Sequence, residues 1–224
     1  MTALLSVDAV GKRFGGLTAL ENVSFELDAG CIVGIMGANG AGKTTLFSLI
    51  AGNARPSTGD IRFAGQSLVG LRPDQICRMG VARTFQIVKP FPALTVLENL
   101  RTAGMFGKAG LRTARRPSST LTLAGQKRLE VARAIATGAQ LILLDEVMAG
   151  LTPVEVAAML DTLRRVRASR GLTLLVIEHV MRALMELCSR IVLLHHGRLI
   201  AQGEPQEIGR NEKVLSVYFG VSGE

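Results

Sequence analysis

Four runs of apolar, mostly branched residues recur along the chain: CIVGIM (31–36), LILLD (141–145), TLLVIE (173–178) and RIVLLH (190–195). Each run is about as long as a β-strand. Its apolar character is continuous rather than alternating, which indicates a strand that is buried on both faces. Strands of this kind belong to parallel sheets that helices cover on both sides. The pattern therefore predicts an α/β fold with a mostly parallel sheet.

Helical patterns occur between these runs. One begins at Lys43 and continues to about residue 51, and a second covers residues 125–137, where apolar positions recur every three or four residues. A third pattern covers residues 152–169, with Thr152 as the expected N-cap and Pro153 at the first helical position. Alternation of strands and helices supports the α/β prediction.

Two regions depart from this alternation. The first 30 residues alternate apolar with polar positions, and GDIRFAG (59–65) reads as a short strand between glycines, so we expect an antiparallel β flank there. Residues 87–119 contain Pro, Gly and Arg without strand periodicity and suggest an inserted lobe. We therefore expect one domain, 1–224, with a nucleotide-binding core of 1–86 and 138–224 and an inserted helical subdomain of 87–137.

Composition narrows the class of protein only modestly. The 224 residues carry a net charge of +8, which suits either nucleic acid or an anionic membrane surface. Trp is absent and Tyr occurs once, so aromatic surfaces for stacking on single-stranded nucleic acid are few. The N-terminus has no secretory-signal pattern, and no apolar run approaches the roughly 20 residues that a membrane span needs. We therefore expect a soluble or peripheral cytoplasmic protein, and no nucleic-acid partner.

The segment GANGAGKT (37–44) carries the strongest chemical signal in the chain. It matches the pattern G-x-x-x-x-G-K-[ST] and lies between a predicted strand and a predicted helix, as that motif requires. Its glycines let backbone N–H groups turn towards phosphates, and the helix adds the positive end of its dipole. Lys43 is expected to reach the β- and γ-phosphates, and the Thr44 hydroxyl to ligate Mg²⁺. The chain is thus predicted to bind a nucleoside triphosphate.

An acidic pair follows the predicted strand LILLD. Ligands gather at the carboxyl ends of strands in open α/β sheets, so Asp145 is placed to hold hydrated Mg²⁺. Glu146 is placed to polarise a water molecule for attack on the γ-phosphate, as a general base. His179 lies just beyond another buried strand, and Gln86 lies in ARTFQIVKPF. Taken alone, neither of these two residues carries a functional signal.

Together these motifs resemble the ATP-binding subunits of ABC transporters, and the resemblance covers nearly the whole chain. It implies a P-loop NTPase fold with ATP and Mg²⁺ as cofactors. By the same resemblance Gln86 touches the metal and faces the permease, His179 contacts the γ-phosphate, and Phe14 stacks on adenine. TLAGQ (122–126) occupies the place of the signature segment, which closes over ATP held by an opposing subunit.

The resemblance thus gives a complete set of expected site residues. The catalytic residues are Glu146, His179 and Gln86, and the metal ligands are Thr44, Gln86 and Asp145. The nucleotide-binding residues are Phe14, Gly37, Ala38, Asn39, Gly40, Ala41, Gly42, Lys43, Thr44, Thr45, Leu123, Gly125 and Gln126.

Three further segments resemble one subgroup of this family, the ATPases of importers for branched-chain amino acids and their relatives for urea or short amides. They are RMGVARTFQIVKPFPALTVLENL (78–100), AGLTP (149–153) and GEPQEIGRNEKVLSVYFG (203–220). The resemblance implies a second ATPase subunit in a homodimer or heterodimer, membrane permease subunits and, indirectly, a periplasmic solute-binding protein. It also implies a peripheral location at the cytoplasmic face of the inner membrane.

The chain departs from the family pattern in two places. Leu123 stands where the family has a serine whose hydroxyl meets the γ-phosphate, a hydrogen bond worth about 1.5–3 kcal/mol. The backbone of Gly125 and the helix N-terminus are then expected to carry the anion binding. In addition, only 35 residues (87–121) separate Gln86 from the signature segment, as if helices had been removed between Arg116 and Pro117. The inserted subdomain is therefore predicted to be short, which bears on coupling to a permease.

Two other functions compete with an importer ATPase. One is a non-transport ABC ATPase that acts on nucleic acid or ribosomes, for which the net charge of +8 is the main support. Steeply salt-dependent nucleic-acid binding would favour it. The other is a non-catalytic nucleotide-binding module left by the shortened lobe, which measured ATPase activity would exclude.

Overall fold

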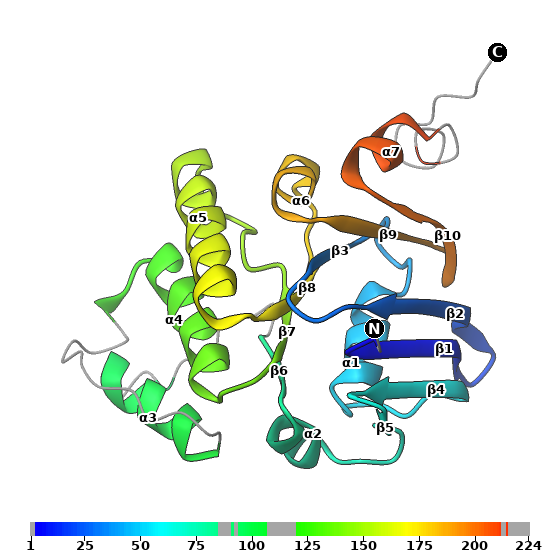
Figure 1. The fold of residues 1–224 in the computed structure, drawn as a ribbon, viewed down its shortest axis with the longest axis horizontal. Coiled ribbons are helices and arrows are strands. Elements are labelled where there is room, and N and C mark those ends of the chain that lie inside the picture. Colours follow the sequence, from blue (N-terminus) through cyan, green and yellow to red (C-terminus); the bar gives the residue numbers. More distant parts are fainter. Residues whose placement is uncertain (1–2, 85–90, 92–93, 107–119, 212–213, 215–224) are drawn as a thin grey trace.

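The computed structural model describes residues 3–84, 91, 94–106, 120–211 and 214 (Figure 1). The described strands form two sheets. The larger has the order β10-β9-β3-β8-β7-β6, in which all neighbours are parallel except β10, which pairs antiparallel with β9. The smaller has the order β2-β1-β4-β5 and is antiparallel throughout. The expected combination of a mostly parallel sheet with an antiparallel flank is confirmed.

The elements follow one another from an antiparallel start to an alternating second half. The strands are β1 (Leu5–Phe14), β2 (Leu17–Leu27), β3 (Ile32–Met36), β4 (Thr58–Phe63), β5 (Gln66–Ser67), β6 (Val81–Arg83), β7 (Leu141–Asp145), β8 (Thr173–Ile177), β9 (Arg190–His195) and β10 (Arg198–Gly203). The helices are α1 (Lys43–Ile50), α2 (Pro73–Met79), α3 (Val96–Phe106), α4 (Leu123–Ala136), α5 (Pro153–Arg170), α6 (Met181–Leu187) and α7 (Pro205–Arg210).

The continuous apolar runs are the central strands, and each divides its side chains between two cores. Val33 and Ile35 of β3 pack in a cluster with the antiparallel sheet and α1. Ile32 and Met36, on the opposite face, pack in a second cluster with residues of α4, α5 and α6. This period of two places apolar side chains on both faces, which is why no polar position interrupts the run.

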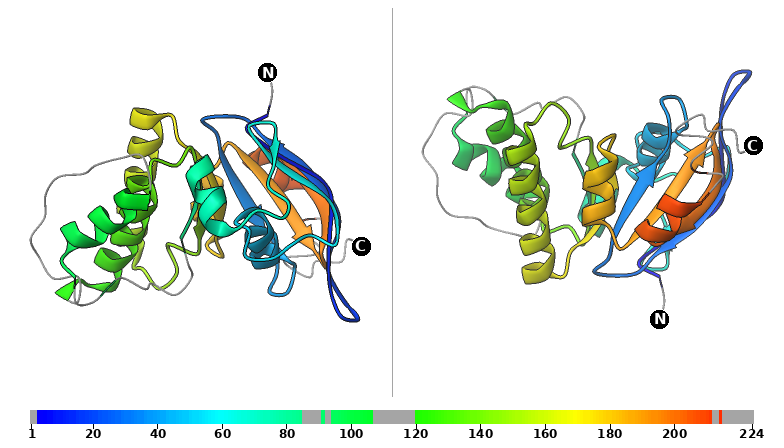
Figure 2. Two further views of the ribbon diagram at one scale, coloured as in Figure 1. Left: turned by 90° about the horizontal axis from the view of Figure 1, so that it is seen from below. Right: turned by 90° about the horizontal axis from the view of Figure 1, so that it is seen from above.

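The antiparallel sheet and the pair α3–α4 lie at opposite ends of the molecule (Figure 2). Helix α1 packs within the first cluster, together with residues of both sheets. At the start of α3, the buried side chain of Asn99 ties the preceding residues to the helix: its amide donates to the carbonyl oxygens of Phe91 and Thr95, and its Oδ1 accepts from the N–H of Phe91.

Two helix starts show how local sequence sets the element boundaries. Helix α5 begins as expected, with Thr152 as N-cap, Pro153 in the first turn and Glu155 completing a capping box. Helix α4 begins at Leu123, two residues earlier than the periodicity indicated, because Thr122 acts as N-cap and its Oγ1 accepts from the N–H of Gly125 at 3.2 Å. None of the described helices combines the length and the apolar character that would let it cross a bilayer.

Candidate functional site

The loop between β3 and α1 has a backbone that only glycine can adopt at its two ends. Gly37 has φ 156° and Gly42 has φ 99°. A Cβ atom on Gly37 would lie 2.5 Å from the carbonyl oxygen of Leu194, and one on Gly42 would lie 2.7 Å from that of Ala19. The loop is therefore pressed against β9 and β2, and its shape depends on the absence of side chains at these two positions.

Lys43 links this loop to the acidic pair beyond β7. Its Nζ donates to the carbonyl oxygens of Gly37 and Ala38 at 2.7 and 3.0 Å. Burial lowers the pKa of Lys43, while the nearby charges of Glu146 and Asp145 oppose that shift. The loop and the acidic pair thus lie within electrostatic reach of each other, although they are far apart in the sequence.

The mouth of the loop is open to solvent. Ala38, Asn39, Gly40 and Thr44 are exposed and Thr45 is half-buried, whereas the flanking glycine at position 37 is buried. The backbone of α1 begins at Lys43, so the N-terminal end of that helix points at the same opening. Exposed backbone at a helix N-terminus is able to receive an anionic ligand without rearrangement of the core.

Asp145 ends β7 in a nearly closed environment. Its Oδ2 accepts a hydrogen bond from Arg83 Nη2 at 2.7 Å, and its own N–H donates to Thr84 Oγ1 at 3.0 Å. Its Oδ1 is buried without a hydrogen-bond partner among the described residues. A buried carboxylate oxygen without a partner is costly, and a hydrated cation would satisfy it. The donor set of Asp145 and the exposed Thr44 hydroxyl therefore fits Mg²⁺.

Glu146 and His179, which follow the ends of β7 and β8, contact each other. Glu146 Oε1 lies 2.8 Å from His179 Nε2, with the carboxylate largely buried and the imidazole 44% exposed. The backbone of Glu146 is left-handed, with φ 51°, a conformation that is unfavourable for a residue with a side chain. Its N–H donates to the carbonyl oxygen of Ile177. The carboxylate is thus held at the site edge by a specific backbone turn.

Sequence reasoning missed two buried charged residues behind this turn. Lys127, on α4, donates from Nζ to the carbonyl oxygen of Glu146 at 2.7 Å. Glu178 accepts a hydrogen bond at Oε1 from the N–H of Met148 at 2.6 Å. Burial raises the pKa of Glu178 to about 7, although the hydrogen bond from Met148 and the charge of Lys127 oppose the shift. One signal for Glu178 was available in the sequence, its position at the end of the apolar run TLLVIE. A carboxylate that continues a buried strand needs a hydrogen-bond partner.

Comparison with known proteins places this geometry in a family. The sequence profile described as ABC transporter matches residues 20–149, more than half of the chain. The chain belongs to the ABC transporter family. It is 37% identical to the high-affinity branched-chain amino acid transport ATP-binding protein LivG of Escherichia coli, with 97% of this chain and 98% of that protein covered. It is 33% identical to the corresponding protein BraF of Pseudomonas aeruginosa, with the same coverage.

The solved structure of MJ1267, an ATP-binding cassette of an ABC transporter, shares the fold of this ABC protein. The TM-score is 0.86 at 25% identity, and the comparison covers 97% of this chain and 99% of that one. The alignment with LivG spans 249 positions against a chain of 224 residues, so at least 25 aligned positions of LivG have no counterpart here. The cassette is thus shorter than LivG, and the shortening of the segment 87–121 stays a prediction.

The signature segment of this ABC cassette lies at the start of α4. Leu123 is 46% exposed, and Gln126 Nε2 donates to the carbonyl oxygen of Leu121 at 3.1 Å. The N–H of Gly125 is engaged by the N-cap hydroxyl of Thr122. Thr122 therefore places a hydroxyl at the helix N-terminus, one residue before Leu123.

Two expected residues of the ABC site are not brought into it by any described contact. Gln86 lies outside the described residues. Phe14, at the end of β1, is 52% exposed, and Lys12 Nζ lies 4.8 Å from the centre of its ring. The following strand, β2, contacts the phosphate loop through Ala19 and Leu20. An exposed ring on this hairpin is available for stacking, and its contact with adenine stays a prediction.

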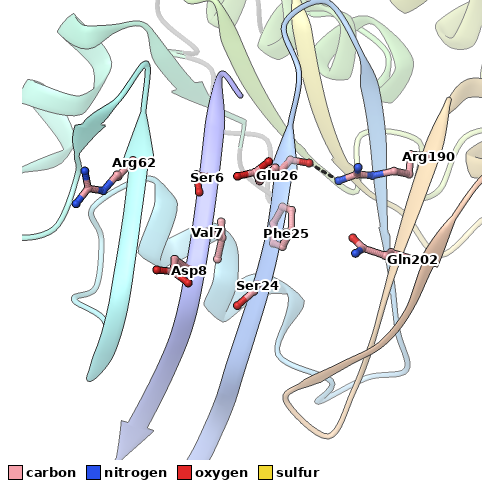
Figure 3. A pocket seen from close by; sticks show the side chains of 9 residues that line it. All are labelled: Ser6, Val7, Asp8, Ser24, Phe25, Glu26, Arg62, Arg190 and Gln202. Carbon is pink, nitrogen blue, oxygen red and sulfur yellow. Dashed lines mark hydrogen bonds between the residues drawn. The ribbon is translucent and has the colours of Figure 1, made fainter. Parts of the chain in front are cut away.

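A separate pocket of 470 Å³ lies along the antiparallel sheet of the ABC cassette (Figure 3). Its lining includes two carboxylates, Asp8 and Glu26, and two guanidinium groups, Arg62 and Arg190. Arg190 donates to the carbonyl oxygen of Glu26, so one of the two guanidinium groups already has a hydrogen-bond partner within the protein. The pocket shares no residue with the phosphate loop or the acidic pair, and it forms no part of the candidate nucleotide site.

Proposed function

We propose that the chain is the ATP-hydrolysing subunit of an ABC importer for branched-chain amino acids. The observation that carries the hydrolytic part is the convergence of Lys43, Asp145 and Glu146, with Glu146 hydrogen-bonded to His179. The solute class is supported by the similarity to LivG and BraF over nearly the full length of each chain.

The loop 37–45 binds the triphosphate of ATP. Lys43 exchanges its two carbonyl partners for the β- and γ-phosphates, and the N–H groups at the start of α1 receive the phosphate oxygens. Thr44, Asp145 and Gln86 would hold Mg²⁺, which supplies neutralisation of phosphate charge. Phe14 stacks on the adenine, since a π-face accepts any flat base.

Glu146 is the general base for the attacking water. Its carboxylate lies beside the phosphate loop, within hydrogen-bond distance of His179, which orients it and contacts the γ-phosphate. The remaining wall comes from the signature segment of a second ATPase subunit, identical or related, and the segment with Leu123, Gly125 and Gln126 closes in turn over the nucleotide of that subunit. ATP thereby joins two cassettes, and hydrolysis lets them separate. The subunit acts as a peripheral protein on membrane permeases at the cytoplasmic face.

The hydrolytic proposal is tested with the Glu146→Gln variant of the purified protein. The amide keeps the shape of the side chain but cannot accept the proton of water, so turnover is expected to fall at least about 100-fold. ATP binding should be retained, and size-exclusion chromatography with Mg·ATP should show an accumulated dimer. Hydrolysis at the wild-type rate would refute the role of Glu146 as base.

The solute proposal needs the membrane partners. Proteoliposomes that contain the ATPase, its permeases and a solute-binding protein are expected to take up leucine, isoleucine and valine in an ATP-dependent way. The same vesicles with the Glu146→Gln subunit serve as the control for leakage. Uptake of urea or a short amide, with none of branched-chain amino acids, would replace the proposed solute while leaving the ATPase assignment intact.

A further inference from the structure

The segment that follows β7 is held by two buried charged side chains that nucleotide binding does not require. Lys127 is 5% exposed and donates to the carbonyl oxygen of Glu146 at 2.7 Å. Glu178 is 2% exposed and accepts from the N–H of Met148 at 2.6 Å. Buried charges are costly unless each has a partner, so these contacts fix the backbone of residues 146–148.

Hydrogen bonds hold the backbone of Glu146 at both its N–H and its carbonyl oxygen. Its N–H donates to the carbonyl oxygen of Ile177, and its own carbonyl oxygen accepts from Lys127. Between these two contacts Glu146 has φ 51°, which a residue with a Cβ atom adopts only when its surroundings impose it. The N–H of Ala149 also donates to this carbonyl oxygen, at 3.3 Å, but the Lys127 contact at 2.7 Å is the shorter one, and its removal would weaken the hold on the carbonyl side of the turn. The carboxylate would then lose its fixed position against His179.

Lys127 belongs to the second turn of the helix whose first turn carries the signature segment. Helix α4 begins at Leu123 after the Thr122 cap, so Lys127 lies about one turn from the helix N-terminus. Within the proposed function, that N-terminus meets ATP held by the opposing subunit. One short stretch of α4 therefore contacts the turn at residues 146–148 of its own cassette, the catalytic turn, and faces the nucleotide of the other.

We propose that Lys127 is a positioning residue for ATP hydrolysis: it ties α4 to the backbone of Glu146, so that the catalytic carboxylate is set only while the signature helix is docked. The inference rests on the proposed function, because it assumes that Glu146 is the base. The contact of Lys127 with Glu146 therefore affects the rate of the chemical step. ATP affinity depends on the phosphate loop instead, whose contacts do not involve Lys127.

The test compares Lys127→Met, Lys127→Arg and Glu146→Gln in the full-length chain. Methionine fills the space of the lysine without its donor, and kcat is expected to fall at least about 10-fold, since small misplacement of a catalytic group has effects of this size. The Kd for a fluorescent ATP analogue should stay within about twofold of wild type. A Mg·ATP-dependent dimer should accumulate, as in Glu146→Gln. Lys127→Arg keeps a cationic donor and should restore most of kcat.

Arg170→Met is the matched control, because it removes an exposed basic side chain from the end of α5 by the same kind of substitution. It should keep the wild-type kcat and Kd. Thermal unfolding shows whether the Lys127→Met protein has folded. If it has not, the kcat of the folded Lys127→Arg protein alone tests the inference. A wild-type kcat in Lys127→Met, or an arginine variant that folds and binds ATP but hydrolyses no faster than Glu146→Gln, would overturn the inference. If Glu146→Gln itself kept full activity, the proposed function would fail instead.

Discussion

The phosphate loop (37–42) and the catalytic turn (146–148) each follow a central strand of the larger sheet, but they are held in different ways. The loop is shaped by its own glycines, with Gly37 and Gly42 lying against neighbouring backbone. The catalytic turn has a strained glutamate instead of a glycine, and side chains of Lys127 and Glu178 hold its backbone. The loop is thus fixed locally, and the turn is fixed by distant elements.

This difference suits two different tasks. A loop that binds an anion must present its N–H groups in one fixed arrangement. Close packing of the loop backbone gives a rigid arrangement of this kind. Under the proposed function, the Glu146 carboxylate works only when two cassettes have closed, so its position has to respond to other elements. Holding the turn with a side chain from α4 makes its geometry depend on where that helix lies. The comparison leads to three predictions, in order of expected effect.

Gly37→Ala should have the largest effect, because it attacks the backbone packing of the loop. The added Cβ would lie 2.5 Å from the carbonyl oxygen of Leu194 and 2.8 Å from Ala41 Cβ. Backbone strain and overpacking of this kind are expected to lower the free energy of unfolding by about 3 kcal/mol or more and to weaken ATP binding. Denaturant unfolding and ATP titration measure the two effects.

Gly40→Ala is the matched control within the same loop. Gly40 also has a positive φ, of 78°, but a Cβ there would meet nothing within 4 Å. Only the conformational strain remains, about 1–2 kcal/mol. Equal losses in the two variants would mean that close packing against β9 does not shape the loop.

The local character of the loop explains why sequence alone predicted it. A contiguous glycine pattern between a strand and a helix contains all the information that its backbone needs, and the four central strands were equally readable from their apolar runs. Helix α5 was predicted with its cap and its proline for the same reason. Glu146, Asp145 and His179 were placed by strand ends together with a family resemblance, and the structure brings them together.

The contacts behind the catalytic turn could not be predicted in this way. Lys127 reads as one more basic residue in an amphipathic helix, and nothing in the sequence indicates that it meets Glu146, 19 positions later. Arg83, which binds Asp145, carries no local signal either, because its partner lies 62 residues away. Such pairings depend on tertiary packing, which a single sequence does not encode in any local pattern.

Glu178→Gln tests whether a buried charge is part of the turn. Burial raises the pKa of Glu178 from an ordinary value near 4.5 to about 7. The folded state therefore binds more protons than the unfolded state between these values, and the wild type loses stability as pH rises from about 5 to about 8. The variant lacks this dependence, so the difference in unfolding free energy should shift in its favour by up to about 3 kcal/mol. Urea unfolding at a series of pH values measures the shift.

Glu98→Gln gives a control of opposite sign when that series is extended below pH 5. Hydrogen bonds from the N–H and hydroxyl of Thr95 lower the pKa of Glu98, so the wild type should gain stability over this variant as pH rises through the acidic range. A difference between wild type and Glu178→Gln that stays constant from pH 5 to 8 would show that the carboxyl group carries no charge cost in the folded protein.

Thr122→Val should have the smallest effect on stability, because it removes a single local contact. Valine keeps the shape of the N-cap residue of α4 but cannot accept from the N–H of Gly125. Loss of a cap typically costs about 1 kcal/mol, and Thr152→Val at the start of α5 sets the scale within the same protein. Urea unfolding of the two variants is expected to give similar losses, while ATP titration of the Thr122→Val monomer should match the wild type. A fall in monomer ATP affinity comparable to that of Gly37→Ala would mean that the signature helix supports its own phosphate loop, and that the two regions are not independent.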